Sequence, residues 1–463
     1  MKTTIRTRKW GRVWPIGSSS GALVAAVGLI GGSASAQSIA PQRLSPDLLQ
    51  TLGVGSRSIA MGGAYTAVAD DISATYWNPG RLGYLTRREF MIEYRPVVAS
   101  NFNSMVLPTG TTASTGVHPG NPQVGFVGLT LPLSTQRYDK TKPGSADRVR
   151  ADLGTIGVSY TLGGYFSLHS TSQLIAPGLD ANNNPVNNDQ ATTTDQFVRN
   201  SFISVVYGTR FAVRRKAPAR EFGIGVGFFV VNQEFSSKIA QSSFQQATKP
   251  NSPKIPIGIP LLPTDVSAHG GGVGGSVGVS YQGVSNDGSS TSPFSFGMSY
   301  RSKAKLSGFN QPLAESFNDE IPDRLNVGMA YTADLKGAHS GTLKHASVLR
   351  TAVEVQFQSA ANRRRDSAGN LSQTDQRRAV ADLHLGLEWV PRLDTSVRTP
   401  IRMGFRTVSN AATVYTYYDN IFSIGAAYQS RSEGALVFSI EPTAEILTSN
   451  GLTQYTITGR IQF

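Results

Sequence analysis

The sequence predicts an all-β protein: a transmembrane antiparallel β-barrel of about 14 strands, with a small helical and looped hatch in its lumen. Three observations support this class. From about residue 150 onward, apolar residues alternate with small or polar ones, which is the period of a β-strand. The alternating segments are about ten residues long or longer, as tilted membrane strands require. Aromatic residues stand near the segment ends, where an interfacial girdle would lie: Tyr281, Tyr300, Tyr331, Trp389, Tyr428 and Tyr455.

The amino-acid composition excludes several other classes of protein. The chain has 463 residues, of which 39% are hydrophobic and 16% are charged, and it has 48 glycines and no cysteine. The low charge content argues against a disordered chain. The lack of cysteine excludes disulfide scaffolds, thiolate metal sites and cysteine nucleophiles. A large soluble β-rich protein stays open as an alternative to the barrel, because a β-sandwich shows the same alternation.

Residues 1–36 have the three parts of a secretory signal peptide. Five basic residues come first, an apolar stretch covers 22–30, and the small residues at 34–36 form a cleavage site. The apolar stretch is too short to cross a bilayer as a helix, so we expect cleavage before Gln37; an uncleaved anchor is the alternative. The leader has no acidic residue, so its loss lowers the formal net charge from +13 to +8. The remaining basic residues form no stripe with aromatics, and we expect no nucleic-acid partner.

Thirteen alternating segments can be placed by counting back from the carboxyl terminus. They lie near 453–463, 434–447, 420–430, 399–408, 379–391, 346–359, 322–335, 293–306, 271–282, 220–235, 197–213, 165–176 and 151–161. Their connections alternate between short and long, as expected for periplasmic turns and external loops. An even barrel needs one more strand, for which 87–99 and 121–134 both qualify. We expect 87–99 to be the first strand and 121–134 to lie in the first external loop, so that residues 86–463 form the barrel.

Residues 37–85 precede the barrel, and from residue 45 onward they do not alternate, which is typical of a compact plug. A glycine pair permits positive φ or close backbone approach, an aspartate pair suits a turn or a helix cap, and Asn-Pro starts a turn. We interpret these as hatch or gating residues, with purely structural turns as the alternative. The residues are Gly62, Gly63, Asp70, Asp71, Asn78 and Pro79.

The stretch MGGAYTAVADD at 61–71, followed by ATYWNP at 74–79, resembles the amino-terminal signature of the FadL-type outer-membrane transporter superfamily, which includes a PorV-like branch. In that superfamily a related stretch precedes an Asn-Pro-Ala-Gly-Leu turn and forms a hatch inside a fourteen-stranded barrel. This chain departs from the turn at Gly80 and Arg81. The resemblance implies the same hatch and barrel here.

Further matches extend the resemblance along the chain. Segments 296–309 and 321–334 resemble late barrel strands of the fatty-acid transporters, whereas Trp77 is typical of the PorV-like branch. The terminal Phe463 resembles the carboxyl-terminal signal that the barrel-assembly machinery reads. The resemblance implies a protein of the outer membrane that takes up long-chain fatty acids or other hydrophobic small molecules. The PorV-like branch implies an alternative, a component that binds and shuttles secreted proteins.

Other motifs lack the context that chemistry would need. Residues 274–278 match the G-x-S-x-G nucleophile elbow, but they lie in an alternating segment with no helix after it. The six histidines lack metal-ligand spacing, and His384 is expected in a polar network of the lumen. A calcium site at residues 70–71 would need six or more oxygen ligands. Residues 363–365, three arginines, could contact lipopolysaccharide phosphates, with a solvated loop as the alternative. We expect no enzyme, cofactor or metal.

Overall fold

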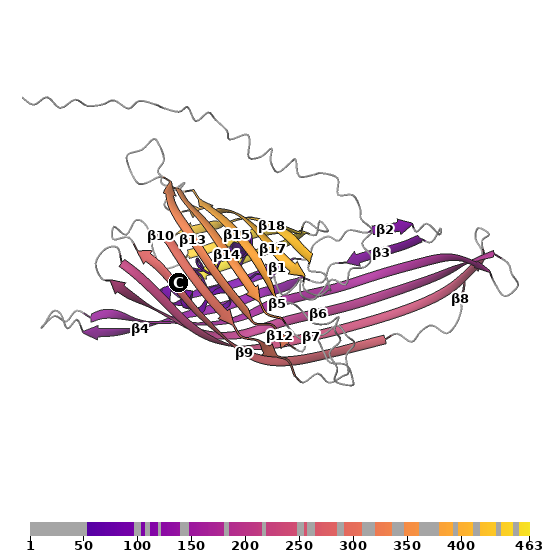
Figure 1. Cartoon of the computed structure of the whole chain (residues 1–463), viewed down its shortest axis with the longest axis horizontal. Helices are drawn as coiled ribbons and strands as arrows, with labels where there is room; N and C mark the ends of the chain where they lie inside the picture. Colours follow the sequence, from indigo (N-terminus) through magenta and orange to yellow (C-terminus); the bar gives the residue numbers. More distant parts are fainter. Residues whose placement is uncertain are drawn as a thin grey trace, which may run out of the picture. The chain divides into compact units, whose positions relative to one another are not determined.

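The structure is a computed structural model, and its described residues form an antiparallel β-barrel (Figure 1). The described ranges are 53–96, 103–106, 112–118, 122–138, 148–179, 185–214, 219–247, 254–256, 264–284, 291–307, 320–335, 347–360, 379–391, 397–410, 417–431, 437–447 and 453–463. The predicted leader, residues 1–36, lies outside them. Within these ranges no helix is long and apolar enough to cross a membrane.

Fourteen strands of the described chain follow one another around a closed wall, each antiparallel to its neighbours. The ring closes where β1 pairs with β21, with Phe90 opposite Ile461. The wall strands are β1 (Glu89–Arg95), β4 (Gln123–Tyr138), β5 (Arg148–Leu179), β6 (Pro185–Arg214), β7 (Ala219–Ala247), β9 (Thr264–Val284), β10 (Thr291–Arg301), β13 (Arg324–Leu335), β14 (Ser347–Gln358), β15 (Val380–Val390), β17 (Ile401–Asn410), β18 (Tyr417–Ala426), β20 (Val437–Leu447) and β21 (Thr453–Gln462).

Short strands accompany the wall; five of them belong to the barrel sheet, and β11 and β12 pair with each other as a separate two-stranded sheet. Three short helical segments precede β1. The short strands are β2 (Asn103–Val106), β3 (Thr112–His118), β8 (Lys254–Pro256), β11 (Ala304–Lys305), β12 (Glu320–Ile321), β16 (Val397–Arg398) and β19 (Tyr428–Arg431). The helical segments are α3 (Ser56–Ala60), α4 (Ala74–Trp77) and the 3₁₀ turn η1 (Pro79–Tyr84).

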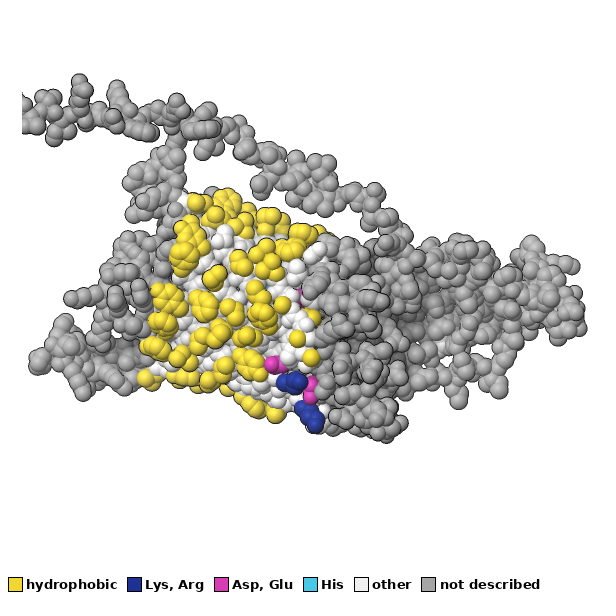
Figure 2. All heavy atoms as spheres, in the orientation of Figure 1, with side chains coloured by type: hydrophobic (Ala, Val, Ile, Leu, Met, Phe, Trp, Pro, Cys, Tyr) yellow, Lys and Arg dark blue, Asp and Glu magenta, His cyan; other side chains and the backbone are white. Residues whose placement is uncertain are grey.

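The apolar face of the alternation is the outer face of the wall. On β6, Ile203 and Val205 are 57% and 51% exposed, whereas Ser204 between them is 6% exposed. Figure 2 shows apolar side chains spread over the visible outer wall, with the visible charged side chains gathered at one edge. A β-sandwich would place its apolar face inside, so this arrangement is the one expected for a barrel in lipid.

The predicted total of about 14 strands is confirmed, but two of the strand assignments behind it are wrong and cancel each other. Segment 121–134 is a wall strand, part of β4, and not an external loop. Segments 151–161 and 165–176 are one continuous strand, β5, and the expected turn at 162–164 is a register shift within it. The physical reason is Gly163: a Cβ there would lie 2.1 Å from the Phe202 ring, so this glycine makes room for an aromatic side chain rather than for a turn.

Three neighbouring strands are much longer than the rest of the wall. β5, β6 and β7 have 32, 30 and 29 residues, against 11 in β10. At about 3.3 Å per residue, these strands extend far beyond the height of the other wall strands. Figure 1 shows them continuing side by side as a ribbon past one end of the barrel, with β8 paired to β7 near its tip.

Candidate functional site: the plug and the inner wall

Residues 53–85, hereafter the plug, lie inside the barrel and contact strands all around it. Helix α3 packs against β17, β18, β20 and β21, and η1 packs against β5, β6, β7 and β9 on the other side. The plug core is buried, with Tyr65 and Met61 fully enclosed and Trp77 2% exposed. The Trp77 indole N–H donates to the carbonyl of Val54 at 2.9 Å, which holds the middle of the plug to its beginning.

The predicted glycine pair is where the plug backbone comes closest to the wall. Gly62 and Gly63 have φ of 62° and 80°, a conformation that favours glycine. A Cβ on Gly62 would lie 2.6 Å from the backbone nitrogen and oxygen of Phe405. A Cβ on Gly63 would lie 2.4 Å from Nδ1 of His384, which is buried on the inner side of β15 as expected for a lumen residue. Both glycines are therefore required for the plug to seat.

The wall meets the plug with glycines of its own, and we call this set the glycine seat. At each position an added Cβ would come within 2.7 Å of a plug atom. Glycine at alternating positions of these strands thus leaves room for the plug. This explains why many inward-facing residues of the wall are small. The G-x-S-x-G match at 274–278 lies within the continuous strand β9. Its last glycine, Gly278, belongs to this set, whereas a Cβ on Gly274 would lie 2.4 Å from the Phe229 ring of the wall. The glycine seat consists of Gly208, Gly223, Gly225, Gly278, Gly297, Gly386, Gly404 and Gly425.

The predicted Asn-Pro turn rests on this seat. The Asn78 side-chain amide donates to the carbonyls of Thr66 at 2.9 Å and Val279 at 3.0 Å, and its oxygen accepts from Gly80 N–H at 2.9 Å. Pro79 follows as the first residue of η1, where its fixed φ suits a helical start. Asn78 thus joins two parts of the plug to β9, so this turn is a structural link between plug and wall.

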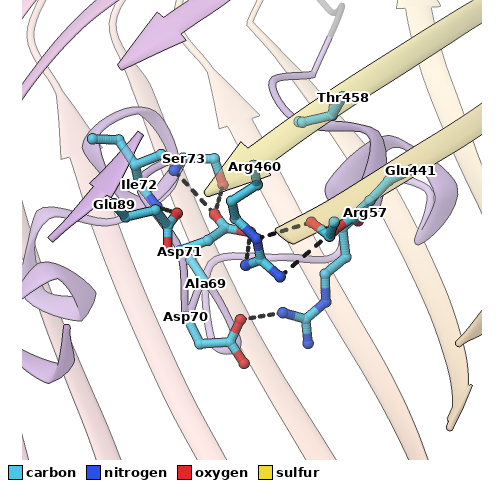
Figure 3. A network of polar contacts seen from close by, with 12 residues as sticks. Arg57, Ala69, Asp70, Asp71, Ile72, Ser73, Glu89, Glu441, Thr458 and Arg460 are labelled. Carbon is cyan, nitrogen blue, oxygen red and sulfur yellow. Dashed lines mark hydrogen bonds and ion pairs between the residues drawn. The ribbon is translucent and has the colours of Figure 1, made fainter. Parts of the chain in front are cut away.

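The two aspartates enter different contacts. Asp70 pairs with the Arg57 guanidinium (Figure 3). It also lies 3.8 Å from the guanidinium of Arg350 on β14. Asp71 accepts from the Tyr65 hydroxyl at 2.9 Å and lies 3.7 Å from Arg460 on β21. Among the described residues no group of three or more histidine or acidic side chains is placed to hold a metal ion. Arginine side chains surround Asp70 and Asp71. The two carboxylates therefore anchor the plug through contacts with the protein's own guanidinium groups.

Wall carboxylates hold the plug, among them Glu388 and Glu354, whose role sequence reasoning missed. Glu388 on β15 accepts from Arg57 at 2.8 Å and 3.0 Å, and it also pairs with Arg350 at 3.0 Å and Arg402 at 3.2 Å. Glu354 on β14 accepts from the backbone N–H groups of Tyr65 and Thr66, both at 2.8 Å, and from the Thr66 hydroxyl. The alternation placed both on the polar face of their strands. It could not identify partners that lie 331 and 288 positions away.

The charged contacts form a continuous chain along one side of the lumen. Arg402 joins Glu388 to Glu441 at 2.8 Å, and Arg460 joins Glu441 at 3.5 Å to Asp71 (Figure 3). The η1 side of the plug meets the seat glycines of β6, β7 and β9, whereas the α3 side meets the ion pairs together with the seat glycines of β15, β17 and β18. The lumen is therefore asymmetric: both halves hold the plug by close packing, and one half adds ion pairs.

A low pH should weaken the ion pairs that hold the plug to the wall. Burial alone would raise the pKa of Asp70, but the guanidinium groups of Arg57 and Arg350 outweigh it and hold the pKa below its ordinary value. Such a carboxylate stabilises the seated plug above its unfolded pKa of about 3.9, and the contribution disappears as the pH falls through the lower folded pKa. We expect Trp77 fluorescence in a Trp389→Phe variant to shift to the red below about pH 4. In Asp70→Asn this acid-induced shift should be smaller, and an unchanged shift would contradict the assignment.

The terminal residue lies beside the junction of plug and barrel. The Phe463 N–H donates to the carbonyl of Arg88 at 3.0 Å, one residue before β1 begins, and its side chain is 48% exposed. The carboxyl end therefore lies at the closing seam of the ring. Its recognition by the barrel-assembly machinery stays a prediction.

Comparisons with known proteins give structural likenesses only. No family model and no curated protein matches the sequence. Three solved structures cover 89% of this chain: the toluene transporter TbuX of Ralstonia pickettii (16% identity, 97% of that chain, TM-score 0.42), the toluene transporter TodX of Pseudomonas putida (11%, 97%, 0.43) and a FadL homologue of Pseudomonas aeruginosa (10%, 98%, 0.40). The barrel fold of this chain follows from its own strand pairing.

Proposed function

We propose that this protein is an outer-membrane channel for the uptake of long-chain fatty acids or other hydrophobic small molecules, with residues 53–85 as its gate. The observation that carries the proposal is a closed barrel with an apolar exterior whose interior is filled by an ion-paired plug. A closed sheet satisfies every backbone group in lipid. A filled lumen suits a ligand-specific passage rather than a water-filled pore. The proposed location requires that the predicted leader directs export.

The geometry supports a gate that can rearrange. The plug is covalently continuous with β1 but otherwise held by noncovalent contacts to the wall, which are close backbone contacts on both sides and ion pairs on one of them. Buried ion pairs add little net stability over an apolar core, because the loss of hydration offsets the attraction between the charges; plug release that returns both partners to water therefore costs less than removal of one partner alone. A hydrophobic ligand that binds the rearranged state better than the seated state would therefore shift the plug.

Removal of the plug tests this proposal. We expect a variant that lacks residues 45–80 and keeps the leader to show altered uptake of radiolabelled oleate into cells, because the gate is gone. The barrel should still assemble, and a heat-modifiable band on electrophoresis of membrane fractions is the control. Oleate uptake indistinguishable from that of the complete chain would refute the gating role.

The long ribbon of β5, β6 and β7 favours a second candidate, the binding and shuttling of secreted proteins. A sheet that continues beyond the barrel offers another chain a place to dock outside the wall. The two functions separate in a deletion strain. Loss of oleate uptake with normal secretion supports transport, whereas retained uptake, together with loss of secreted proteins that co-purify with the barrel, supports the shuttle.

A further inference from the structure

Two histidines of different strands occupy paired positions on the ribbon of β5, β6 and β7. His118 is the last residue of β3, and the strand register places it directly opposite His169 of β5. Directly opposite residues of antiparallel strands lie on the same face of the sheet, with Cβ atoms about 4.5–5.5 Å apart. The two histidines are far apart along the chain, so a search of the sequence for metal-ligand spacing does not find this pair.

Charged residues continue this histidine pair across the sheet as one row. Asp195 of β6 is directly opposite His169, Lys238 of β7 is opposite Asp195, and Asp265 of β9 is opposite Lys238. Opposite charges at directly opposed positions stabilise a sheet. Lys238 has a carboxylate on each side in this row, so Asp195 is not needed to balance it alone. A carboxylate is therefore placed next to the histidine pair.

The row lies on the face of the ribbon that continues the outer face of the wall. Asp195 and the exposed Ile203 are separated by an even number of positions on β6, with no register shift of that strand between them, and even spacing keeps residues on one face. Between them on this face, Arg199 pairs with Glu234 of β7 at 2.6 Å, and each side chain is 33% exposed. Charged residues thus replace apolar ones before the row is reached. The row therefore belongs to the part of the sheet beyond the lipid-facing belt.

We propose that His118 and His169 bind a divalent transition-metal ion, such as Zn²⁺ or Cu²⁺, and that this ion joins β3 to the ribbon. Imidazole suits these ions, and metal–nitrogen bonds of about 2.0–2.1 Å fit between two histidines on neighbouring strands. Asp195 is the carboxylate that accepts from the second ring nitrogen of His169, an arrangement that orients a metal-binding imidazole and raises its basicity. Water completes the coordination of the ion.

A bound ion would hold the end of the β3–β5 ladder. The two histidines are the last of the seven pairs that join these strands, and β3 in turn pairs with β2, so both short strands depend on this ladder for their place on the sheet. The chain has no cysteine, so a disulfide cannot link the strands. A metal that joins two distant positions limits the freedom of the detached state instead. It would also keep β3 on an edge of β5 where another chain could otherwise pair.

The test titrates Zn²⁺ into the full-length mature protein in nanodiscs, purified with a tag that contains no histidine, and follows binding by calorimetry. Asp195→Asn should lower zinc affinity roughly tenfold, as expected for the loss of a carboxylate behind a metal ligand. His118→Asn and His169→Asn should each lower it further, because each removes one of the two protein ligands. Asp189→Asn is the matched control on β6, since its opposite residue on β5 is Ile175, and it should leave zinc affinity unchanged. Heat-modifiability confirms that each variant is folded.

Two measurements on the wild-type protein complete the test. Zn²⁺ should slow amide hydrogen exchange in residues 112–118, and the electron paramagnetic resonance spectrum of added Cu²⁺ should show coupling to two imidazole nitrogens. His269→Asn, whose opposite residue on β7 is Glu234 and not a histidine, should change neither result.

Three results would overturn the proposal. Equal zinc binding by the wild type and by a variant that lacks both His118 and His169 would mean an adventitious ion only. A copper spectrum with fewer than two imidazole nitrogens, or exchange in residues 112–118 that zinc does not change, would refute the site even if a variant fails to fold. None of these measurements involves uptake, so the metal site and the proposed transport function stand or fall separately.

Discussion

Replacement of Gly404 by alanine is expected to prevent the plug from seating. A Cβ at this position would lie 2.0 Å from the backbone nitrogen of Gly62 and 2.4 Å from the carbonyl carbon of Met61. Backbone atoms cannot rotate away as the tip of a side chain can, so the cost should exceed the roughly 1–3 kcal/mol typical of overpacking. In a Trp389→Phe background, we expect Trp77 fluorescence to shift to the red and the plug to become sensitive to protease.

Gly459 of β21 provides the matched control for this variant. It is also a strand glycine, but a Cβ there would lie 3.7 Å from the Ile92 side chain, an ordinary contact on the outer side of the wall. Gly459→Ala should leave the Trp77 spectrum and protease resistance unchanged, and both variants should remain heat-modifiable. If Gly404→Ala gives the same Trp77 spectrum as Gly459→Ala, the seated geometry described above is wrong.

Glu388→Gln should produce the second large loss of plug stability, because this one carboxylate pairs with three guanidinium groups. The substitution leaves Arg57, Arg350 and Arg402 with a neutral acceptor in place of their shared anion. Removal of one partner from a buried ion pair typically costs about 3–5 kcal/mol. We expect the urea midpoint for plug release, followed by Trp77 fluorescence in the Trp389→Phe background, to fall sharply, while the barrel itself resists urea.

Two controls separate the ion-pair effect from a general loss of charge. Glu320 pairs with the more exposed Lys303 at 3.0 Å, and Glu320→Gln should cost no more than about 1 kcal/mol. A double-mutant cycle with Arg57→Met should show a coupling energy with Glu388→Gln, since the two residues share a contact. Additive effects in this cycle would show that Glu388 does not hold the plug through Arg57.

Much of the barrel could be predicted because strand alternation is a local property. The alternation of residues 203–211 directly predicts the outward face of β6. The number of such segments predicts a closed ring of about 14 strands. The error at Gly163 shows the limit of this reasoning. Glycine in a strand permits a turn, a bulge or a close aromatic contact, and only the position of Phe202 decides among them.

The plug contacts could be predicted only in part. The glycine pair, the aspartates and the Asn-Pro turn stand out by residue type, and the structure places all of them against other plug residues or the wall. Their partners do not stand out, because Glu354 and Glu388 look like any polar residue on an inward face. Which inward position meets which plug residue depends on strand tilt and register around the ring, and these are set by the whole sheet rather than by any local sequence.

The position of the plug at the start of the chain has a consequence for biogenesis. Ser56 bonds to Thr458, 402 positions later, and α3 packs on β20 and β21, which are synthesised after the other wall strands. The plug therefore has no finished binding surface until β21 pairs with β1. Contacts of such long sequence separation form late and slowly. Closure of the ring between β1 and β21 and seating of the plug should thus occur together. A partly assembled barrel would then not form an open pore in the membrane.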